Sequence, residues 1–148
     1  MGFTTVTSEF RLSVSSDMKN LAVIADFVTA VAEKLGLDED ETFALQMAID
    51  EACSNVMEHA YRGRVDGEVS LRVQAVDDEV VITIHDQGEP FDPHSVPRPD
   101  ISAPLHERHN GGLGLYLMEK LMDSVEWKFD PERGNTLTMR KRRGKSTI

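Results

Sequence analysis

The first part of the chain passes from an alternating to a helical pattern of apolar positions. Residues 3–16, FTTVTSEFRLSVSS, alternate well enough to predict a strand. Asp17 is placed to cap a helix that Gly36 then stops. The apolar residues of that helix recur at helical spacing: Leu21, Ile24, Val28, Val31 and Leu35.

A second helix is predicted from the acidic segment DEDET, residues 38–42, to about Tyr61, because acids at a helix start suit the helix dipole. Its expected core stripe is Leu45, Ala48, Ile49, Ala52 and Val56. A second stripe is different in character, since it holds Met47, Glu51, Asn55 and Glu58.

The second half predicts two hairpins around one more helix. Strands are expected over residues 67–76 and 79–86, joined at Asp77-Asp78, and over 124–130 and 136–142, joined by PERGN. The third helix is expected over GGLGLYLMEKLMD, after a proline-broken segment without periodicity. This order predicts an α+β two-layer sandwich, a mainly antiparallel mixed sheet with helices on one face, as a single domain over residues 1–148.

Composition narrows the possible classes of protein. With 148 residues, 40% apolar and 28% charged, the chain has the make-up of a soluble globular protein. No apolar run reaches the ~18 residues of a membrane span, and we expect no signal peptide. One cysteine, Cys53, allows no internal disulfide, which makes the cytoplasm the default compartment. The net charge of −10 argues against nucleic-acid binding. The basic tail, residues 140–148, is either a solvated terminus or a contact for an acidic partner or RNA.

Glu51 and Asn55 stand four residues apart and therefore share one helix face. An asparagine carbonyl oxygen suits Mg²⁺, and a glutamate one turn earlier is placed to take a proton from a hydroxyl or water. On this motif alone a solvated helix face is the favoured reading.

Asp86 ends a predicted strand, and Gly88 follows two residues later. The carboxylate can accept from an exocyclic amino group such as that of adenine, beside a glycine that leaves room for a flat ring. An ordinary Asp-x-Gly turn explains the same sequence.

The segment NGGLGL, residues 110–115, opens the third helix. Glycines at a helix start let backbone N–H groups approach a phosphate, although a hinge with a cap explains them too. The phosphate loop of P-loop enzymes is absent, because Met139 stands where its first glycine is needed. A zinc site at His106 and His109 is not favoured, since they stand in a proline-broken segment with no thiol or clear carboxylate partner. His59 is interpreted as a structural residue at a helix end.

Taken in order, these motifs resemble the GHKL ATP-binding fold of gyrase, heat-shock chaperones, mismatch-repair ATPases and histidine kinases. The details DEACSNVMEHAY, DQGEPFDP and GGLGLYLMEKLMDSVEW are similar to the anti-sigma-factor serine/threonine kinases within that superfamily. The resemblance covers nearly the whole chain. One departure is Glu89-Pro90, where many GHKL proteins carry a second glycine soon after the first.

The resemblance implies a role for each matching residue. Glu51 matches the catalytic base, Asn55 the Mg²⁺ ligand, and Asp86 the adenine-binding carboxylate with Gly88 beside it. Residues 87–110 match the ATP lid, from which Arg108 is assigned to the terminal phosphate. Thr136 resembles the threonine that supports the adenine pocket. The phosphate-binding box is matched by Asn110, Gly111, Gly112, Leu113, Gly114 and Leu115.

The same resemblance implies a protein serine/threonine kinase that uses ATP and Mg²⁺ and works as a homodimer. Its expected partners are a STAS-domain anti-anti-sigma factor, which receives the phosphoryl group, and a sigma factor, which it sequesters. Two alternatives stay open: an ATP-dependent binding module with little catalysis, and a detached histidine-kinase catalytic domain. The first 60 residues offer no dimerising helical hairpin with a phosphoacceptor histidine, which disfavours the latter.

Overall fold

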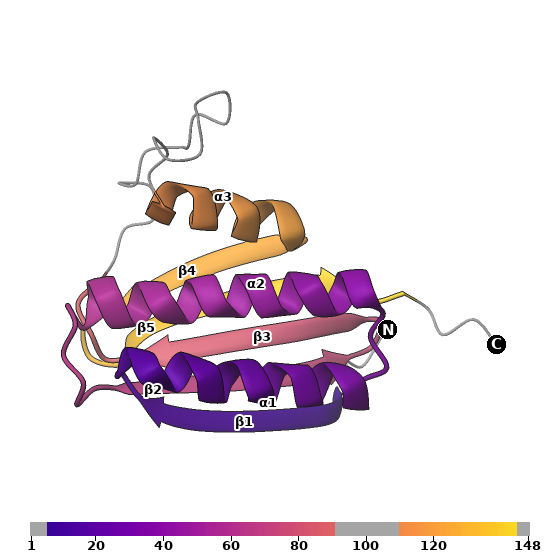
Figure 1. The fold of residues 1–148 in the computed structure, drawn as a ribbon, viewed down its shortest axis with the longest axis horizontal. Coiled ribbons are helices and arrows are strands. Elements are labelled where there is room, and N and C mark those ends of the chain that lie inside the picture. Colours follow the sequence, from indigo (N-terminus) through magenta and orange to yellow (C-terminus); the bar gives the residue numbers. More distant parts are fainter. Residues whose placement is uncertain (1–5, 91–109, 145–148) are drawn as a thin grey trace.

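A computed structural model describes residues 6–90 and 110–144, and within them one sheet, three α-helices and two short helical turns. The strands are β1 Val6–Ser15, β2 Glu68–Val76, β3 Glu79–Asp86, β4 Ser124–Asp130 and β5 Gly134–Arg142. The helices are α1 Leu21–Lys34, α2 Glu39–Asn55 and α3 Asn110–Leu121, with a 3-10 turn η1 Met18–Asn20 and a π turn η2 Val56–Ala60. The predicted helices and hairpins are thereby confirmed (Figure 1).

The five strands form a single sheet in the order β1-β2-β3-β5-β4. All four strand pairings are antiparallel. The α+β sandwich is therefore confirmed, but the expectation of a mixed sheet is wrong for the described residues. Two of the pairs, β2 with β3 and β4 with β5, are hairpins, which reverse the chain. β1 pairs with β2 after the two intervening helices, and β3 pairs with β5 across the sheet, and both of these pairs are antiparallel too.

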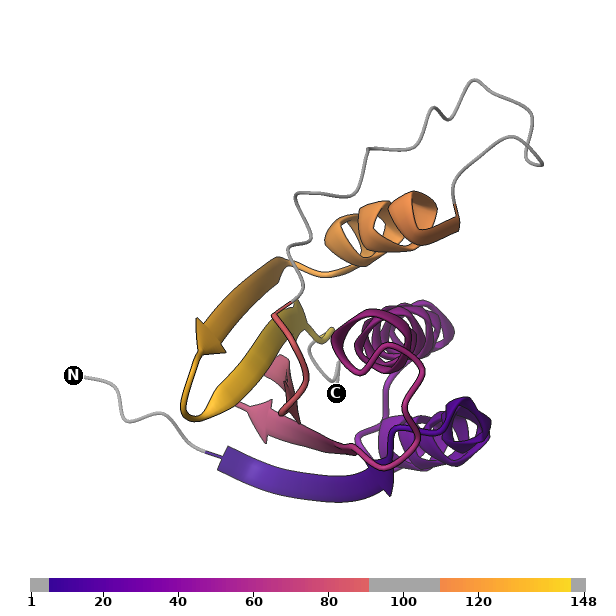
Figure 2. The same cartoon turned by 90° about the vertical axis from the view of Figure 1, so that its left-hand side faces the viewer.

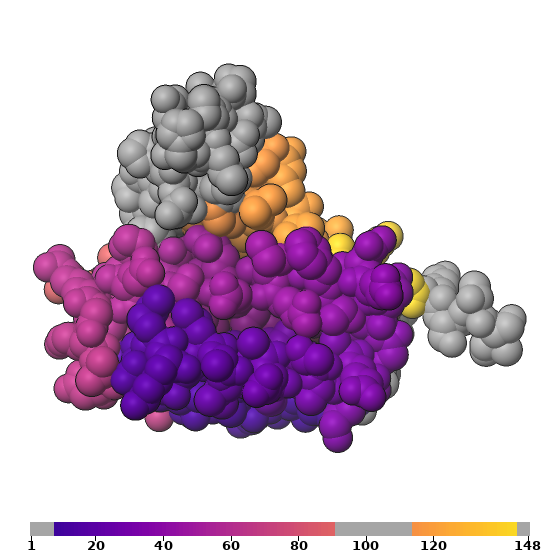
Figure 3. Space-filling view, viewed as in Figure 1, coloured from indigo at the N-terminus to yellow at the C-terminus, as the bar shows by residue number. Residues whose placement is uncertain are grey.

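The helices lie on one side of the sheet and leave the other side without a helix in the described chain (Figure 2). Along β2 buried residues alternate with half-buried ones, as expected when only one face meets a helix layer. In the space-filling view α1 and α2 form one continuous front surface, and α3 stands above α2 (Figure 3).

The core lies between the sheet and the helices. The predicted core stripe of α2, from Leu45 to Val56, is buried throughout, with exposed fractions of 0% to 8%. From α1, Ile24, Val28 and Val31 are buried, and Leu21 and Leu35 pack at the edge. No helix in the described ranges is long and apolar enough to cross a membrane.

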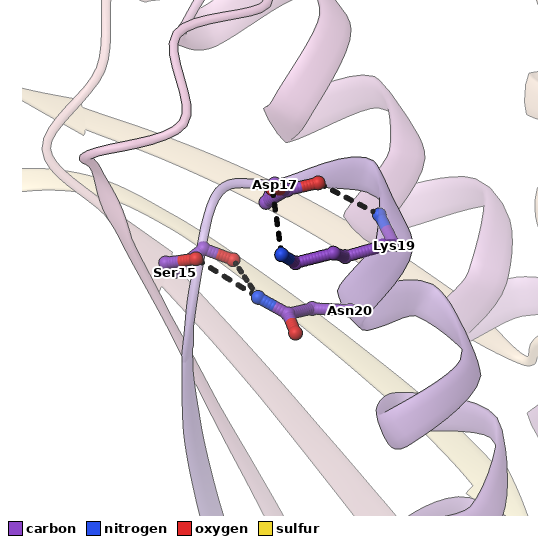
Figure 4. A network of polar contacts seen from close by, with 4 residues as sticks. All are labelled: Ser15, Asp17, Lys19 and Asn20. Atoms are coloured by element: carbon purple, nitrogen blue, oxygen red, sulfur yellow. Dashed lines mark hydrogen bonds and ion pairs between the residues drawn. The ribbon is translucent and has the colours of Figure 1, made fainter.

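Local hydrogen bonds fix where the helices begin and end. Asp17 accepts from the backbone of Lys19 at 3.0 Å, while the Asn20 amide donates to Ser15 at its carbonyl and hydroxyl (Figure 4). Asp38 and Glu41 form a capping box, which fixes the start of α2. Gly36, with φ of +68°, ends the preceding segment as predicted.

Candidate functional site

The helix that carries Glu51 and Asn55 changes its winding directly after Asn55. Residues 56–60 form a π turn, and the Tyr61 N–H donates to the Val56 carbonyl at 2.9 Å. A π turn holds an extra residue and shifts the phase of the helix, and such turns often occur at functional sites. Asn55, Val56 and Met57 are consequently all buried, although they follow one another in sequence.

Glu51 is partly buried, and its carboxyl group lies against Gly114 of α3. A Cβ atom added to Gly114 would overlap the carboxyl carbon and both oxygens of Glu51. Burial raises the pKa of Glu51 to about 7, opposed by a hydrogen-bonding contribution of Asn55 and assisted by the charges of Asp50 and Glu58. A carboxyl with this pKa exchanges its proton near neutral pH, which suits a general base.

Asn55 is 4% exposed, and its Nδ2 is buried without a hydrogen-bond partner among the described residues. It lies close enough to Glu51 to lower that pKa, but no hydrogen bond joins the two side chains. A 180° turn of the amide exchanges Nδ2 for Oδ1 and presents a carbonyl oxygen instead. The position therefore fits an Mg²⁺ ligand, since an oxygen there has no competing partner in the described chain.

Asp86, at the end of β3, is 4% exposed and held by two donors. The Gly88 N–H and the Asn135 Nδ2 each lie 2.8 Å from its Oδ1, so Oδ2 accepts no hydrogen bond from the described residues. Burial raises the pKa of Asp86, and Asn135, Gly88 and His85 oppose that rise. One oxygen is therefore fixed by the protein and the other is left for an amino donor.

Gly88 packs flush against the end of the π turn. A Cβ there would lie 2.6 Å from the carbonyl carbon and oxygen of Ala60, which explains why this position takes glycine. Glu89, where the sequence departs from the two-glycine pattern, donates its N–H to Ala60 O at 2.8 Å. Its carboxylate pairs with Arg62 at 2.7 Å.

Sequence reasoning missed Asn135. Its Nδ2 lies 2.8 Å from Asp86 Oδ1, 3.0 Å from Gly88 O and 3.4 Å from Glu89 O. The predicted Thr136 borders the same cavity, but alternation along β5 turns its side chain toward the face without helices. A signal was present in the sequence, because the strand pattern puts residues 135, 137 and 139 on the buried face.

A cavity of about 20 Å³ joins Asn55 to Asp86. It is lined by Asn55, Val56, Ala60, Asp86, Trp127, Phe129, Asn135, Thr136 and Leu137. That volume holds about one water molecule, so the cavity as it stands does not contain an adenine ring. Phe129, which is 42% exposed, is one of its lining side chains.

The predicted phosphate-binding box forms the first turns of α3. Gly114 faces Glu51, and Leu115 packs into the hydrophobic core with 7% exposure. Residues 110–113 lie on the helix, but the positions of their side chains are outside the description. Arg108 and most of the expected lid, residues 91–109, also lie outside the described residues.

Three further expectations concern histidine and cysteine. His59 lies exposed at the end of the π turn, 3.9 Å from Glu58. Cys53 is fully buried, and burial raises the pKa of its thiol to about 12, so it is not a thiolate nucleophile. In residues 6–90 and 110–144 no three acidic, histidine or cysteine side chains gather as a metal cluster, and His106 and His109 fall outside that part.

Comparison with known proteins agrees with this geometry. Residues 14–141 match the family model of the histidine kinase-like ATPase domain. The serine-protein kinase RsbW of Bacillus licheniformis is 37% identical over 127 residues, covering 82% of this chain and 77% of the relative. RsbW of Bacillus subtilis strain 168 is 34% identical over 136 residues, covering 88% and 83%. The chain therefore belongs to the histidine kinase-like ATPase family, within its branch of RsbW serine-protein kinases.

A solved structure shares the fold. The chain with the RsbU and RsbW domains of Rv1364c from Mycobacterium tuberculosis superposes with a TM-score of 0.68 at 17% identity. The match covers 93% of this chain and 33% of that larger one. The shared architecture confirms the expected ATP-binding fold class.

Proposed function

We propose that this chain transfers the terminal phosphoryl group of ATP to a serine or threonine hydroxyl of a partner protein. The carrying observation is Glu51, whose pKa is raised to about 7 where its carboxyl group meets Gly114 at the start of α3. A proton acceptor thus lies beside a helix start, where partial positive charge favours phosphate.

Each end of the site has a distinct task in this proposal. Asp86 accepts the adenine amino group through Oδ2, and Asn135 holds the other oxygen. Asn55 holds Mg²⁺ through its amide oxygen, and Mg²⁺ would neutralise charge on the phosphates during transfer. The backbone N–H groups at residues 110–114 hold the phosphates. Arg108 is proposed to reach the terminal phosphate from the lid.

Glu51 takes the proton of the acceptor hydroxyl. The hydroxyl oxygen bonds to the terminal phosphorus of ATP while the bond between that phosphorus and the ADP oxygen breaks. The products are a phosphorylated partner, ADP and a protonated Glu51, which releases its proton to water. Phosphoryl transfer depends mainly on positioning and charge stabilisation, so one base and one metal site are sufficient for the reaction.

The partners follow from the family. We propose that the acceptor is a STAS-domain anti-anti-sigma factor and that the chain sequesters a sigma factor, as a homodimer in the cytoplasm. The family resemblance supports these assignments, and an ATP-dependent binding module without transfer is the competing function.

One experiment separates the two functions. The chain is incubated with radiolabelled ATP, Mg²⁺ and STAS proteins from the same genome, beside a Glu51→Gln variant. Label on a partner serine or threonine, lost in the variant while ATP binding persists, supports the kinase. ATP binding without any transfer supports the binding module, and label on a partner histidine contradicts both.

A further inference from the structure

Tyr61, directly after the π turn, joins two backbone segments through one hydroxyl. The side chain is 3% exposed. Its hydroxyl donates to Glu68 O at 2.7 Å and accepts from Gln87 N–H at 2.8 Å. The second contact falls on the residue between Asp86 and Gly88, the two positions assigned to adenine.

The same junction contains other contacts between the helix end and this segment. Glu89 N–H donates to Ala60 O at 2.8 Å, and Gly88 leaves no room for a Cβ against Ala60. The end of α2 and the end of β3 lie at the same end of the molecule (Figure 1). Residues 86–89 are thus fastened to the helical element that carries Glu51 and Asn55.

We propose that Tyr61 is a positioning residue of the nucleotide site, whose hydroxyl fixes the distance between the adenine end and the catalytic end. The inference rests on the proposed function, since it assigns Asp86 to adenine. Removing the hydroxyl leaves the Gln87 N–H without its acceptor and lets the Asp86–Gly88 segment shift. The Asp86 carboxylate is then no longer held where the adenine amino group arrives.

The aromatic ring and the hydroxyl have separable roles. Gly67 packs directly on the ring, because a Cβ there would lie within 2.5 Å of three ring atoms. Tyr61→Phe keeps this packing and removes only the bridge. The variant therefore tests the hydroxyl without opening a cavity.

Ser16, directly after β1, supplies a matched control because its hydroxyl binds the loop that follows Tyr61. Its hydroxyl donates to Arg64 O at 2.5 Å and accepts from Gly67 N–H at 3.0 Å. Like Tyr61, it is a buried hydroxyl that bridges one carbonyl and one N–H. Neither of its partners belongs to residues 86–89, so Ser16→Ala loosens the loop without touching the adenine end.

The test compares wild type, Tyr61→Phe and Ser16→Ala in three measurements: ATP and GTP dissociation constants by calorimetry, the thermal midpoint, and Gln87 amide exchange without nucleotide. We expect Tyr61→Phe to weaken ATP binding about tenfold, the effect of one or two lost buried hydrogen bonds. The affinity for GTP changes less, because its base lacks the amino group of adenine. The Gln87 amide proton exchanges faster than in wild type. Ser16→Ala lowers the thermal midpoint but keeps the ratio of ATP to GTP affinity.

The outcomes separate the inference from the proposed function. ATP affinity within twofold of wild type in Tyr61→Phe, while wild type binds ATP, overturns the positioning role alone. The positioning role is also overturned if ATP affinity falls equally in both variants, in step with their thermal midpoints. No ATP binding by wild type overturns the proposed function, and the inference with it.

Discussion

The two ends of the proposed nucleotide site differ in how many of their polar groups are hydrogen-bonded within the protein. At the adenine end Asp86 accepts two hydrogen bonds on one oxygen, and Asn135 holds three neighbouring oxygens. At the catalytic end Asn55 Nδ2 has no partner in the described chain, and burial raises the Glu51 pKa. In the proposed function, the contacts at the first end hold Asp86 in position for adenine. At the second end, Asn55 and Glu51 are left to bind a metal ion and a proton.

Glu51→Gln gives the largest expected effect, because it removes only the proton acceptor. We expect phosphoryl transfer to fall by about 10²–10⁴-fold, the usual contribution of general base catalysis, with ATP affinity retained. Radiolabel transfer and calorimetric binding measure the two quantities. Asp50→Asn, a change at the exposed neighbour, serves as the control; it removes a charge that raises the Glu51 pKa and should transfer nearly normally at pH 8, where Glu51 is mostly ionised. Equal activity of wild type and Glu51→Gln would falsify the assignment of the base.

Asn55→Ala acts on the metal rather than on the proton. Binding of ATP in the presence of Mg²⁺ should weaken about 10- to 100-fold, as expected when a charged partner loses a ligand. Binding in EDTA should hardly change, which makes the metal dependence an internal control. A similar loss in both conditions would mean that Asn55 supports the pocket and not the metal.

Asn135→Ala tests the adenine end, where the effect should appear in stability. A buried carboxylate loses a donor, so the free energy of unfolding should fall by about 1–2 kcal/mol in urea titrations. Because the pKa of Asp86 is raised by folding, its ionisation removes stability as the pH rises through that pKa. Without Asn135 the pKa rises further, so the loss should grow as the pH rises through the pKa of Asp86. A loss independent of pH contradicts the assigned role.

The pH dependence of phosphoryl transfer gives the smallest expected effect and tests the catalytic end alone. With a Glu51 pKa of about 7, kcat/KM for the acceptor should fall about tenfold from pH 8 to pH 6, since the free enzyme loses its base form. Folding raises this pKa, so Glu51 favours the native state less as the pH rises from 4.5 to 7. Glu51→Gln should therefore gain stability relative to wild type at pH 8. A flat kcat/KM profile would contradict the raised pKa.

Much of the fold could be predicted because its signals are local. The alternation before Asp86 and the spacing from Leu45 to Val56 report which face is buried, and both were read correctly. The resemblance supplied the site residues, and the structure brings Glu51 to Gly114 and Asn55 to the cavity that Asp86 lines.

What escaped prediction depends on distant contacts. Asn135 meets Asp86 across 49 positions, and the Tyr61 hydroxyl meets Gln87 across 26. The π turn is equally hidden, since its sequence fits an ordinary helix, and its last carbonyl, Ala60 O, accepts from Glu89 N–H 29 positions further on. Asn135 is the neighbour of the predicted Thr136, which also lines the cavity, and in a strand one position exchanges the two faces.

Gly114 bears on how genetic screens of this chain should be interpreted. A selection for lost partner phosphorylation would recover substitutions at Gly114, and a reader would assign them to failed phosphate contact. Yet the first carbon of any side chain there overlaps the carboxyl group of Glu51. Such alleles should therefore group with those of Glu51, keeping nucleotide occupancy while losing transfer, and this pairing would reveal the two helices as one functional unit.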